Sequence, residues 1–202
     1  MLKRLFDIVF SFAGLLALSP LLLLIAILIK LEDGGPIFYR GERVGRLGTT
    51  FKIFKFRTMV VDAEKLGASS TPEDDSRITK IGEFLRRYKL DELPQLINVL
   101  NGKMSLIGPR PQVPWAVKLY SKKEKDLILS IAPGITDYAS IRFPNEGEIL
   151  RGSVDPDKDY MKKIHPEKTR LQLEYVKRVS LKEDVKILVQ TIKVLLKNIR
   201  KG

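Results

Sequence analysis

The feature that most limits how this chain can fold is a run without any charged residue, from Ile8 to Ile29 (IVFSFAGLLALSPLLLLIAILI). A helix needs about 20 apolar residues to cross the hydrocarbon of a bilayer, and this run matches that length. A cleaved secretory signal would have a shorter apolar core that ends at a small-residue cleavage site. Here the apolar run continues through Leu21–Ile29, past the small residues of Ala17–Ser19. We therefore expect the segment to remain in the protein as a membrane element.

Ser19-Pro20 lies near the middle of this run and predicts a break in the helix. Proline has no N–H to donate and clashes with the carbonyl four residues earlier, so the helix bends. The Ser19 hydroxyl can bind a carbonyl that the break leaves free. Cations flank both ends, with Lys3 and Arg4 before the run and Lys30 after it. If both ends prefer the cytoplasmic side, the helix enters the bilayer, turns and returns. A proline-kinked helix that crosses the bilayer is the alternative.

The remaining composition restricts the chemistry. The chain has no cysteine, which excludes a disulfide framework, a cysteine-ligated zinc site and an iron–sulfur cluster. A single histidine, His165, argues against a histidine-rich metal site and against a Ser-His-Asp triad. Carboxylates, cationic side chains, hydroxyls and a bound divalent cation remain. The 36 Lys and Arg against 24 Asp and Glu give a net charge of +12, which predicts an anionic partner.

The sequence after the apolar run predicts a mainly α-helical chain with a small β-hairpin. The segments PIFYR and FKIFKFR lie on either side of the glycine-containing turn Gly45–Gly48, which is typical of a hairpin within residues 36–57. Thr79 is expected to cap one helix, and a second helix is expected from about Asp91 to Leu100. We expect three parts in one integrated unit: a membrane helix at 1–32, a compact catalytic domain at 33–180 and a C-terminal helix at 181–202.

The C-terminal segment 181–202 has the pattern of an amphipathic helix. Apolar residues recur at steps of three and four, at Leu181, Val185, Leu188, Ile192, Leu195 and Ile199. Lysines such as Lys186 and Lys193 lie off this stripe. The helix either packs on the domain or lies in the headgroup layer with its cations toward anionic lipid.

Asp91 and Glu92 form the best candidate for a catalytic pair. Pro94 predicts that a helix begins at or beside Asp91, which places both carboxylates near the positive end of the helix dipole. Successive helical residues point about 100° apart, so the two acids could border one pocket and do different work. Taken alone, acids in a first helical turn are most often caps.

Cations around this pair strengthen the interpretation. Arg110 lies between Pro109 and Pro111, in a backbone with little freedom, which suits a guanidinium aimed at a phosphate. The other predicted phosphate- or nucleotide-binding residues are Lys55, Arg57, Arg86 and Thr136. Any single basic cluster is usually only a solvated face. Several around one acidic pair, together with a membrane element, indicate a phosphate ester handled at a bilayer.

Motifs in one continuous order along the chain resemble those of the bacterial sugar transferases, the monotopic phosphoglycosyl transferases that initiate glycan assembly. The resembling blocks are Ser19-Pro20, Asp33–Phe38, Arg43–Gly45, Phe54–Met59, Arg77–Thr79, Leu90–Leu96, Asn98–Ser105, Gly108–Pro111 and Pro133–Thr136. The resemblance covers nearly the whole chain. It implies a re-entrant N-terminal helix hairpin, a cytoplasmic catalytic domain and interfacial amphipathic helices at the bacterial inner membrane.

The resemblance also implies a reaction: transfer of a sugar 1-phosphate from a UDP-sugar to polyprenyl (undecaprenyl) phosphate, with release of UMP. Asp91 would be the nucleophile that forms a phosphosugar–enzyme intermediate. Glu92 would bind Mg²⁺ (or Mn²⁺) with the phosphates or transfer a proton, and Asp91 and Glu92 are the expected metal ligands. The expected partners are the two substrates and inner-membrane lipids, a homodimer is an open alternative, and no nucleic acid is expected.

Two departures from the family pattern leave the sugar undetermined. Asp137-Tyr138 stands where many relatives have Gly-Trp, and Gln172 stands where some have an aspartate. The rival class is a non-catalytic, membrane-tethered basic domain that binds anionic lipid or nucleic acid. The net charge favours it, but the sequence has no exposed strand with interleaved aromatics and no DNA-reading motif.

Overall fold

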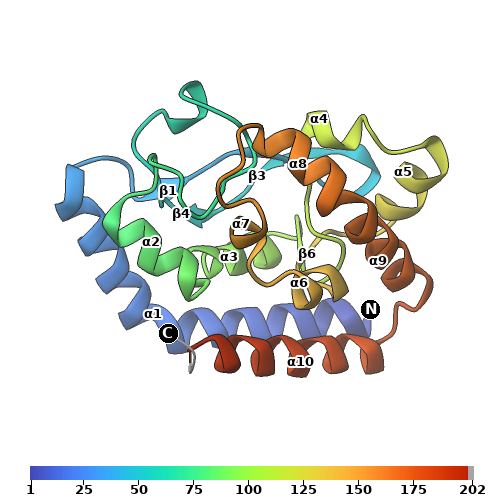
Figure 1. Cartoon of the computed structure of the whole chain (residues 1–202). Helices are drawn as coiled ribbons and strands as arrows, with labels where there is room; N and C mark the ends of the chain where they lie inside the picture. The colour runs from blue at the N-terminus through green and yellow to red at the C-terminus, as the bar shows by residue number, and fades with distance from the viewer. Residues whose placement is uncertain (200–202) are drawn as a thin grey trace.

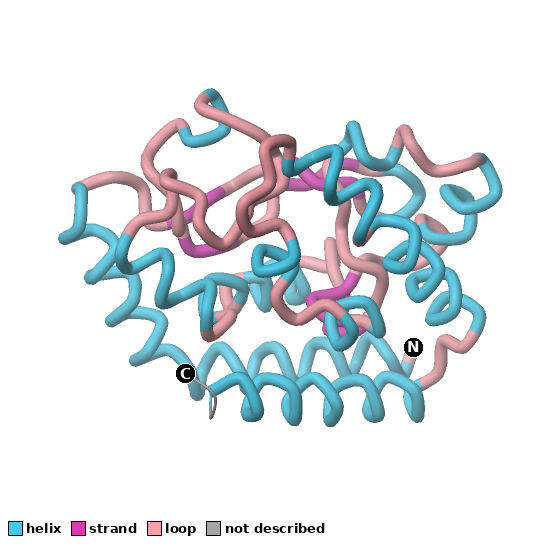
Figure 2. Tube along the Cα trace, in the orientation of Figure 1, coloured by secondary structure: helices cyan, strands magenta, loops and turns pink. Residues whose placement is uncertain are grey.

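A computed structural model describes residues 1–199 of the chain. It is mainly helical, with a long bent helix along one edge and short strands on the opposite side (Figures 1 and 2). The helices are α1 (Leu2–Asp33), α2 (Lys80–Arg87), α3 (Gln95–Leu100), α4 (Pro114–Val117), α5 (Lys122–Ile128), α6 (Tyr138–Arg142), α7 (Glu146–Ile149), α8 (Pro156–Lys163), α9 (His165–Lys177) and α10 (Leu181–Ile199). The last three residues of the predicted segment 181–202 lie outside the described residues.

At the predicted break α1 bends but remains one continuous helix. Pro20 lies inside it, and Figure 1 shows the helix bending partway along. Pro20 cannot donate to the carbonyl of Leu16, and the Ser19 hydroxyl donates to that oxygen instead, at 2.8 Å. The hydroxyl therefore replaces the hydrogen bond that proline removes, which explains why the helix continues through the bend.

Each limb of α1 packs on the domain through a narrow face. In the second limb Ile25 and Ile29 pack against Phe56 and Leu85. Most of the remaining apolar side chains of α1 are exposed, and only 11% of its most apolar stretch is buried. Among the described residues, α1 is the one helix that is long and apolar enough to cross a bilayer.

Polar residues in the first two turns fix α1 to the rest of the chain. Asp7 is 3% exposed and accepts hydrogen bonds from the Ser105 hydroxyl and the Leu106 N–H, both at 3.0 Å. Lys3 donates to Asp184 at 2.6 Å and to the carbonyl of Ile107 at 3.0 Å. These bonds hold the start of α1 against strand β5 (Ser105–Ile107) and helix α10.

The predicted hairpin is confirmed, in two short sections. Strands β2 (Glu42–Val44) and β3 (Thr50–Lys52) pair antiparallel across a 3₁₀ turn at Arg46–Gly48. Strands β1 (Phe38–Tyr39) and β4 (Lys55–Phe56) continue the pairing, with Tyr39 opposite Lys55. This register places Lys55 at the end of the hairpin that faces Asp91 and Glu92, and thus positions one cation of the candidate site.

A third strand pair was not predicted. Strand β5 runs parallel to β6 (Gly134–Thr136), with Ser105 opposite Gly134 and Ile107 opposite Thr136. The backbones of Gly108 and Gly134 meet so closely that a Cβ on Gly134 would lie 2.0 Å from the Gly108 nitrogen. Glycine is required there because any side chain would collide with the neighbouring backbone.

Helix α10 packs on the domain through a face that differs from the predicted stripe. Asp184 and Ile187 are fully buried, and Leu188 packs against the main core. Other apolar side chains of α10 point outward, namely Val185, Val189, Ile192 and Leu196. Some residues of the predicted apolar stripe therefore pack on the domain, such as Leu188, and others are exposed, such as Val185 and Ile192. This is possible because α10 carries apolar side chains on both faces.

Candidate active site

Asp91 and Glu92 lie on a 3₁₀ turn (Leu90–Glu92) that precedes α3. The prediction that the helix begins at Asp91 is wrong, because α3 begins at Gln95. Lys89, directly before the turn, has a left-handed backbone (φ 58°), which reverses the chain between α2 and the acids. Thr79 caps α2 by accepting from the N–H of Gly82 at 3.0 Å, as predicted. The acids are thus held between two short helices rather than in the first turn of one.

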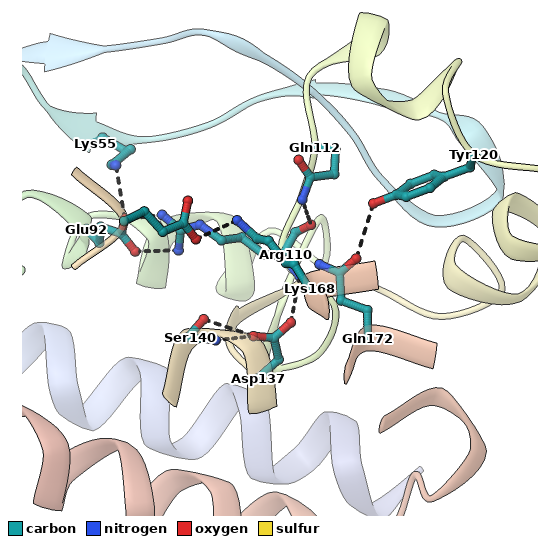
Figure 3. A network of polar contacts seen from close by, with 10 residues as sticks. Lys55, Glu92, Arg110, Gln112, Tyr120, Asp137, Ser140, Lys168 and Gln172 are labelled. Atoms are coloured by element: carbon teal, nitrogen blue, oxygen red, sulfur yellow. Dashed lines mark hydrogen bonds and ion pairs between the residues drawn. The ribbon is translucent and has the colours of Figure 1, made fainter. Parts of the chain in front are cut away.

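Glu92 is held by two cations (Figure 3). The Arg110 guanidinium donates to both carboxylate oxygens of Glu92, one of these bonds being 2.8 Å long. Lys55 donates to the Oε1 atom of Glu92 at 3.0 Å. Burial would raise the pKa of Glu92, but Arg110 and Lys55 together hold this pKa well below its ordinary value. Glu92 is therefore ionised at neutral pH and fully engaged by cations.

Asp91 has a different environment from its neighbour. Its Oδ2 atom lies 3.0 Å from the Nζ atom of Lys55. Its Oδ1 atom is buried and, within residues 1–199, has no hydrogen-bond partner. An orphaned buried carboxylate oxygen is unusual, and such an atom indicates either a ligand or a reactive role. Lys55 bridges the two acids, while only Asp91 keeps a free oxygen.

The metal prediction can be tested against these contacts. Mg²⁺ binds proteins through one or two carboxylates and completes its shell with water and substrate phosphates. The free Oδ1 atom of Asp91 fits such a ligand, whereas both oxygens of Glu92 are already occupied by Arg110 and Lys55. Within the described part of the chain no group of three or more acidic or histidine side chains is placed to hold a metal. The geometry supports Asp91 as a ligand more than it supports Glu92.

A large cavity of about 1240 Å³ opens over the acid pair. Cations from several elements line it, among them Lys55, Arg86, Lys89, Arg110 and Lys168. The sequence analysis did not point to Lys89, Lys168 or Glu146, which also line it. Lys168 of α9 is almost fully buried and is paired with Glu146 of α7 at 2.6 Å. Sequence reasoning could not find this pair, because it joins two helices that only the tertiary structure brings together.

Two predicted binding residues have other contacts. Arg57 lies at the cavity wall, but its guanidinium pairs with Asp33 at the end of α1 and donates to the carbonyls of Pro36 and Met59. It therefore clamps the end of α1 to β4 and is not free for a phosphate. The Thr136 hydroxyl lies 2.8 Å from the Thr191 hydroxyl, which joins β6 to α10. Both residues line the cavity, but their polar groups already have partners within the protein, and their predicted binding roles remain predictions.

Arg86 and Arg110, the other two predicted arginines, also line the cavity. Arg86, on α2, is half-buried at the cavity wall, and among the described residues its side chain makes no hydrogen bond or ion pair. It is thus available for an anion. Arg110 is held as predicted in the Pro109–Pro111 loop, and its backbone N–H donates to Asp137 at 3.3 Å. Its guanidinium is aimed at Glu92, although the sequence had suggested a phosphate.

The two departures from the family pattern lie behind the cavity wall. Asp137 is fully buried, caps α6 by accepting from the Ser140 N–H at 2.8 Å, and supports Arg110 (Figure 3). Gln172 is also fully buried and accepts from the Tyr120 hydroxyl at 3.2 Å. Neither residue is among those that line the cavity. Both residues therefore support the wall of the cavity from behind, and the sugar stays undetermined.

A buried acid pair under a ring of cations, beside a long exposed apolar helix, is typical of an enzyme that handles phosphate esters at a membrane. The comparison with known proteins agrees: a model described as "Bacterial sugar transferase" matches residues 1–198. The chain belongs to the bacterial sugar transferase family.

Several curated proteins are similar to the chain. Undecaprenyl-phosphate glucose phosphotransferase of Komagataeibacter xylinus is 39% identical over 95% of this chain and 35% of its own length. UDP-glucose:undecaprenyl-phosphate glucose-1-phosphate transferase of Escherichia coli is 38% identical over 95% of this chain and 39% of its own length. Exopolysaccharide production protein PSS of Rhizobium leguminosarum is 38% identical over 95% and 93%. The chain thus spans little more than a third of the first two relatives and nearly all of the third.

Proposed function

We propose that this protein transfers a sugar 1-phosphate from a UDP-sugar to polyprenyl phosphate and releases UMP, as a first step of glycan assembly. The observation that carries the proposal is the buried Asp91 carboxylate, which keeps one free oxygen in a cavity lined with cations. The names of the relatives, which include undecaprenyl-phosphate glucose and glucose-1-phosphate transferases, support the choice of substrates.

In the first step the Oδ1 atom of Asp91 attacks the phosphorus atom that carries the sugar. An aspartyl–phosphate bond forms, the pyrophosphate P–O bond breaks, and UMP leaves with the bonding electron pair. In the second step an oxygen of polyprenyl phosphate attacks the same phosphorus. The aspartyl P–O bond breaks, Asp91 is regenerated as a carboxylate, and a polyprenyl diphosphate sugar is formed. A carboxylate nucleophile requires neither a cysteine nor a histidine, in agreement with the composition.

The other residues hold and balance charge. Lys55 contacts both acids, so its charge faces the two carboxylates and the incoming phosphates together. Glu92 is fixed by Arg110 and stays ionised, which favours a positioning role over proton transfer. Arg86 and Lys89 are placed to bind phosphate oxygens. A Mg²⁺ (or Mn²⁺) would be held mainly by the donor phosphates beside the Asp91 carboxylate and would neutralise charge that develops on the phosphoryl oxygens, so that the free Oδ1 atom stays available for the attack.

We also propose the membrane arrangement. Helices α1 and α10, which both carry exposed apolar side chains, lie along one edge of the molecule (Figure 1). In this proposal α1 enters the cytoplasmic leaflet, bends at Ser19-Pro20 and returns, while α10 lies in the headgroup layer. The catalytic residues would then face the cytoplasm at the inner membrane. The contacts of Lys3 with Asp184 support this, because they keep the first turn of α1 beside the domain.

The test separates catalysis from simple lipid binding. Detergent-solubilised protein is mixed with a UDP-sugar alone, quenched, and analysed for UMP and for a phosphosugar adduct on intact protein by mass spectrometry. We expect one UMP per active site and an adduct on Asp91. Asp91→Asn keeps the shape but removes the nucleophilic charge, so both signals should disappear while the fold is retained. Lipid binding without UMP release, under all metal conditions, would favour the rival non-catalytic basic domain.

A further inference from the structure

The cavity over the acid pair has an apolar arm that the proposed chemistry does not use. Besides the cations, the cavity is lined by apolar side chains from four different elements: Leu96 of α3, Leu106 of β5, Ile135 of β6, and Leu188, Ile192 and Leu195 of α10. These residues join the acid pair to α10, and α10 also packs on β5, β6 and α6. The arm therefore leads from the charged centre to the edge of the molecule formed by α10.

The exposure of these side chains changes along the arm. Leu96, four residues after Glu92, and Leu106 are each 8% exposed, whereas Ile192 on α10 is 49% exposed. The cavity thus reaches the surface at Ile192. Val189, one turn earlier on α10, is almost equally exposed (45%) but does not line the cavity. Ile192 and Val189 are therefore aliphatic, lie on the same helix and have similar exposure, but only Ile192 lines the cavity.

We propose that this apolar arm receives the first isoprenoid units of the polyprenyl phosphate and guides its phosphate to Asp91. The proposal rests on the function proposed above and names the residues that would hold the lipid substrate. The occupant must be apolar along most of its length and anionic at one end. The arm matches this order, because its outer wall is aliphatic and its inner end meets Lys55 and Arg110.

The other substrate does not fit this arm. A nucleotide sugar is polar throughout, and burying its hydroxyls against aliphatic walls would leave them without hydrogen-bond partners. A lipid chain gains free energy from the same walls. The arm opens beside the exposed apolar side chains of α10, so a prenyl chain could pass from the bilayer into the cavity without crossing water. The hydrogen bond between Thr136 and Thr191 holds α10 to β6 at this junction and keeps the arm in shape.

The experiment uses the absence of native cysteine in the chain. Ile192→Cys is prepared in the full-length protein, and Val189→Cys serves as the matched control with similar exposure on the same helix. In detergent, the rate at which a maleimide alkylates the introduced thiol is measured with and without saturating undecaprenyl phosphate. We expect the lipid to slow alkylation of the Ile192→Cys protein at least about fivefold and to change that of the Val189→Cys protein less than twofold. Equal protection at both positions, or at neither, would overturn the proposal.

A second readout separates this proposal from the proposed function. In alkylated Ile192→Cys the adduct should occlude the arm, so multiple turnover with undecaprenyl phosphate should fall at least about tenfold relative to alkylated Val189→Cys. The single burst of UMP from UDP-sugar alone should be the same in the two alkylated proteins. Equal turnover in both would overturn the lipid path while leaving the chemistry intact. Failure of unmodified native protein to release UMP would instead overturn the proposed function.

Discussion

The buried ion pair between Arg110 and Glu92 allows a controlled test of the site, because the same pair geometry occurs on the surface. Arg110 donates two roughly parallel hydrogen bonds to Glu92, whose side chain is 14% exposed. Arg170 does the same to Glu167, with bonds of 2.7 and 2.8 Å, but its own side chain is 59% exposed. Arginine-to-lysine substitution keeps the charge in both pairs and removes the planar fork.

The expected magnitude follows from the contacts. Lysine at position 110 has one amine in place of the fork, so one of the two hydrogen bonds to the Glu92 carboxylate is lost and this buried acceptor is left short of a donor. An unsatisfied buried acceptor costs about 1–3 kcal/mol. In a chain of this size each kcal/mol lowers the Tm by about 2–4 °C, so Arg110→Lys should lower it by about 2–12 °C. Arg170→Lys should change the Tm much less, because water replaces the lost bond.

The assay is thermal unfolding of both variants in the same detergent, followed by UMP release at saturating lipid. We expect kcat/KM for the UDP-sugar to fall about tenfold or more in Arg110→Lys, because the Glu92 carboxylate loses its fixed orientation. A Tm for Arg110→Lys equal to that of Arg170→Lys, together with unchanged kcat/KM, would refute the reasoning. Arg110 would then be a structural turn residue with no role in the site.

Three further predictions concern the metal, the membrane helix and the single histidine. EDTA should reduce UMP release at least about a hundredfold and Mg²⁺ should restore it, whereas full activity in chelator would contradict a metal. The introduced thiol of Leu2→Cys should react with a membrane-impermeant maleimide only after cell lysis. Adding Ser19→Ala and Pro20→Leu should make this thiol accessible to labelling in intact cells. Labelling in intact cells with Ser19-Pro20 unchanged would contradict the re-entrant proposal. Burial, together with the charge of Lys168, lowers the pKa of His165 in the folded protein. The unfolded chain therefore binds a proton at His165 more tightly than the folded chain does. The free energy of unfolding should fall as the pH drops below about 6.5. Urea unfolding from pH 5 to 8 checks this: His165→Gln should remove the slope, and an equal slope in both proteins would contradict it.

Local signals in the sequence predicted local structure well. Proline geometry predicted the bend at Ser19-Pro20, and the Thr79 side chain caps α2 as its position before an apolar stripe suggested. The glycine-containing turn predicted the hairpin, and Asn101-Gly102 predicted where α3 ends. Each of these depends on backbone preferences of a few consecutive residues, which are visible in a sequence.

The parts that were missed depend on partners distant in the chain. Strands β5 and β6 are too short to show a period, and they pair parallel only because helices and loops bring them together. The choice among cations was also not predictable: Arg57 and Lys55 lie two residues apart with the same charge, but one faces Asp33 and the other faces the acids. Residues two apart in a strand share a face, so alternation could not separate these two cations; Arg57 lies just past the end of β4 and turns toward the end of α1.

The polar contacts of Lys3 and Asp7 also order the events of biosynthesis. Lys3 leaves the ribosome 181 positions before its partner Asp184. At about 5–20 residues per second, synthesis of that interval takes about 9–36 s. Through this interval the apolar helix has been synthesised, but α10, which receives Lys3, is still incomplete. In the proposed membrane arrangement, α1 would therefore insert before the domain has folded, and the contact of Lys3 would form only once α10 is released.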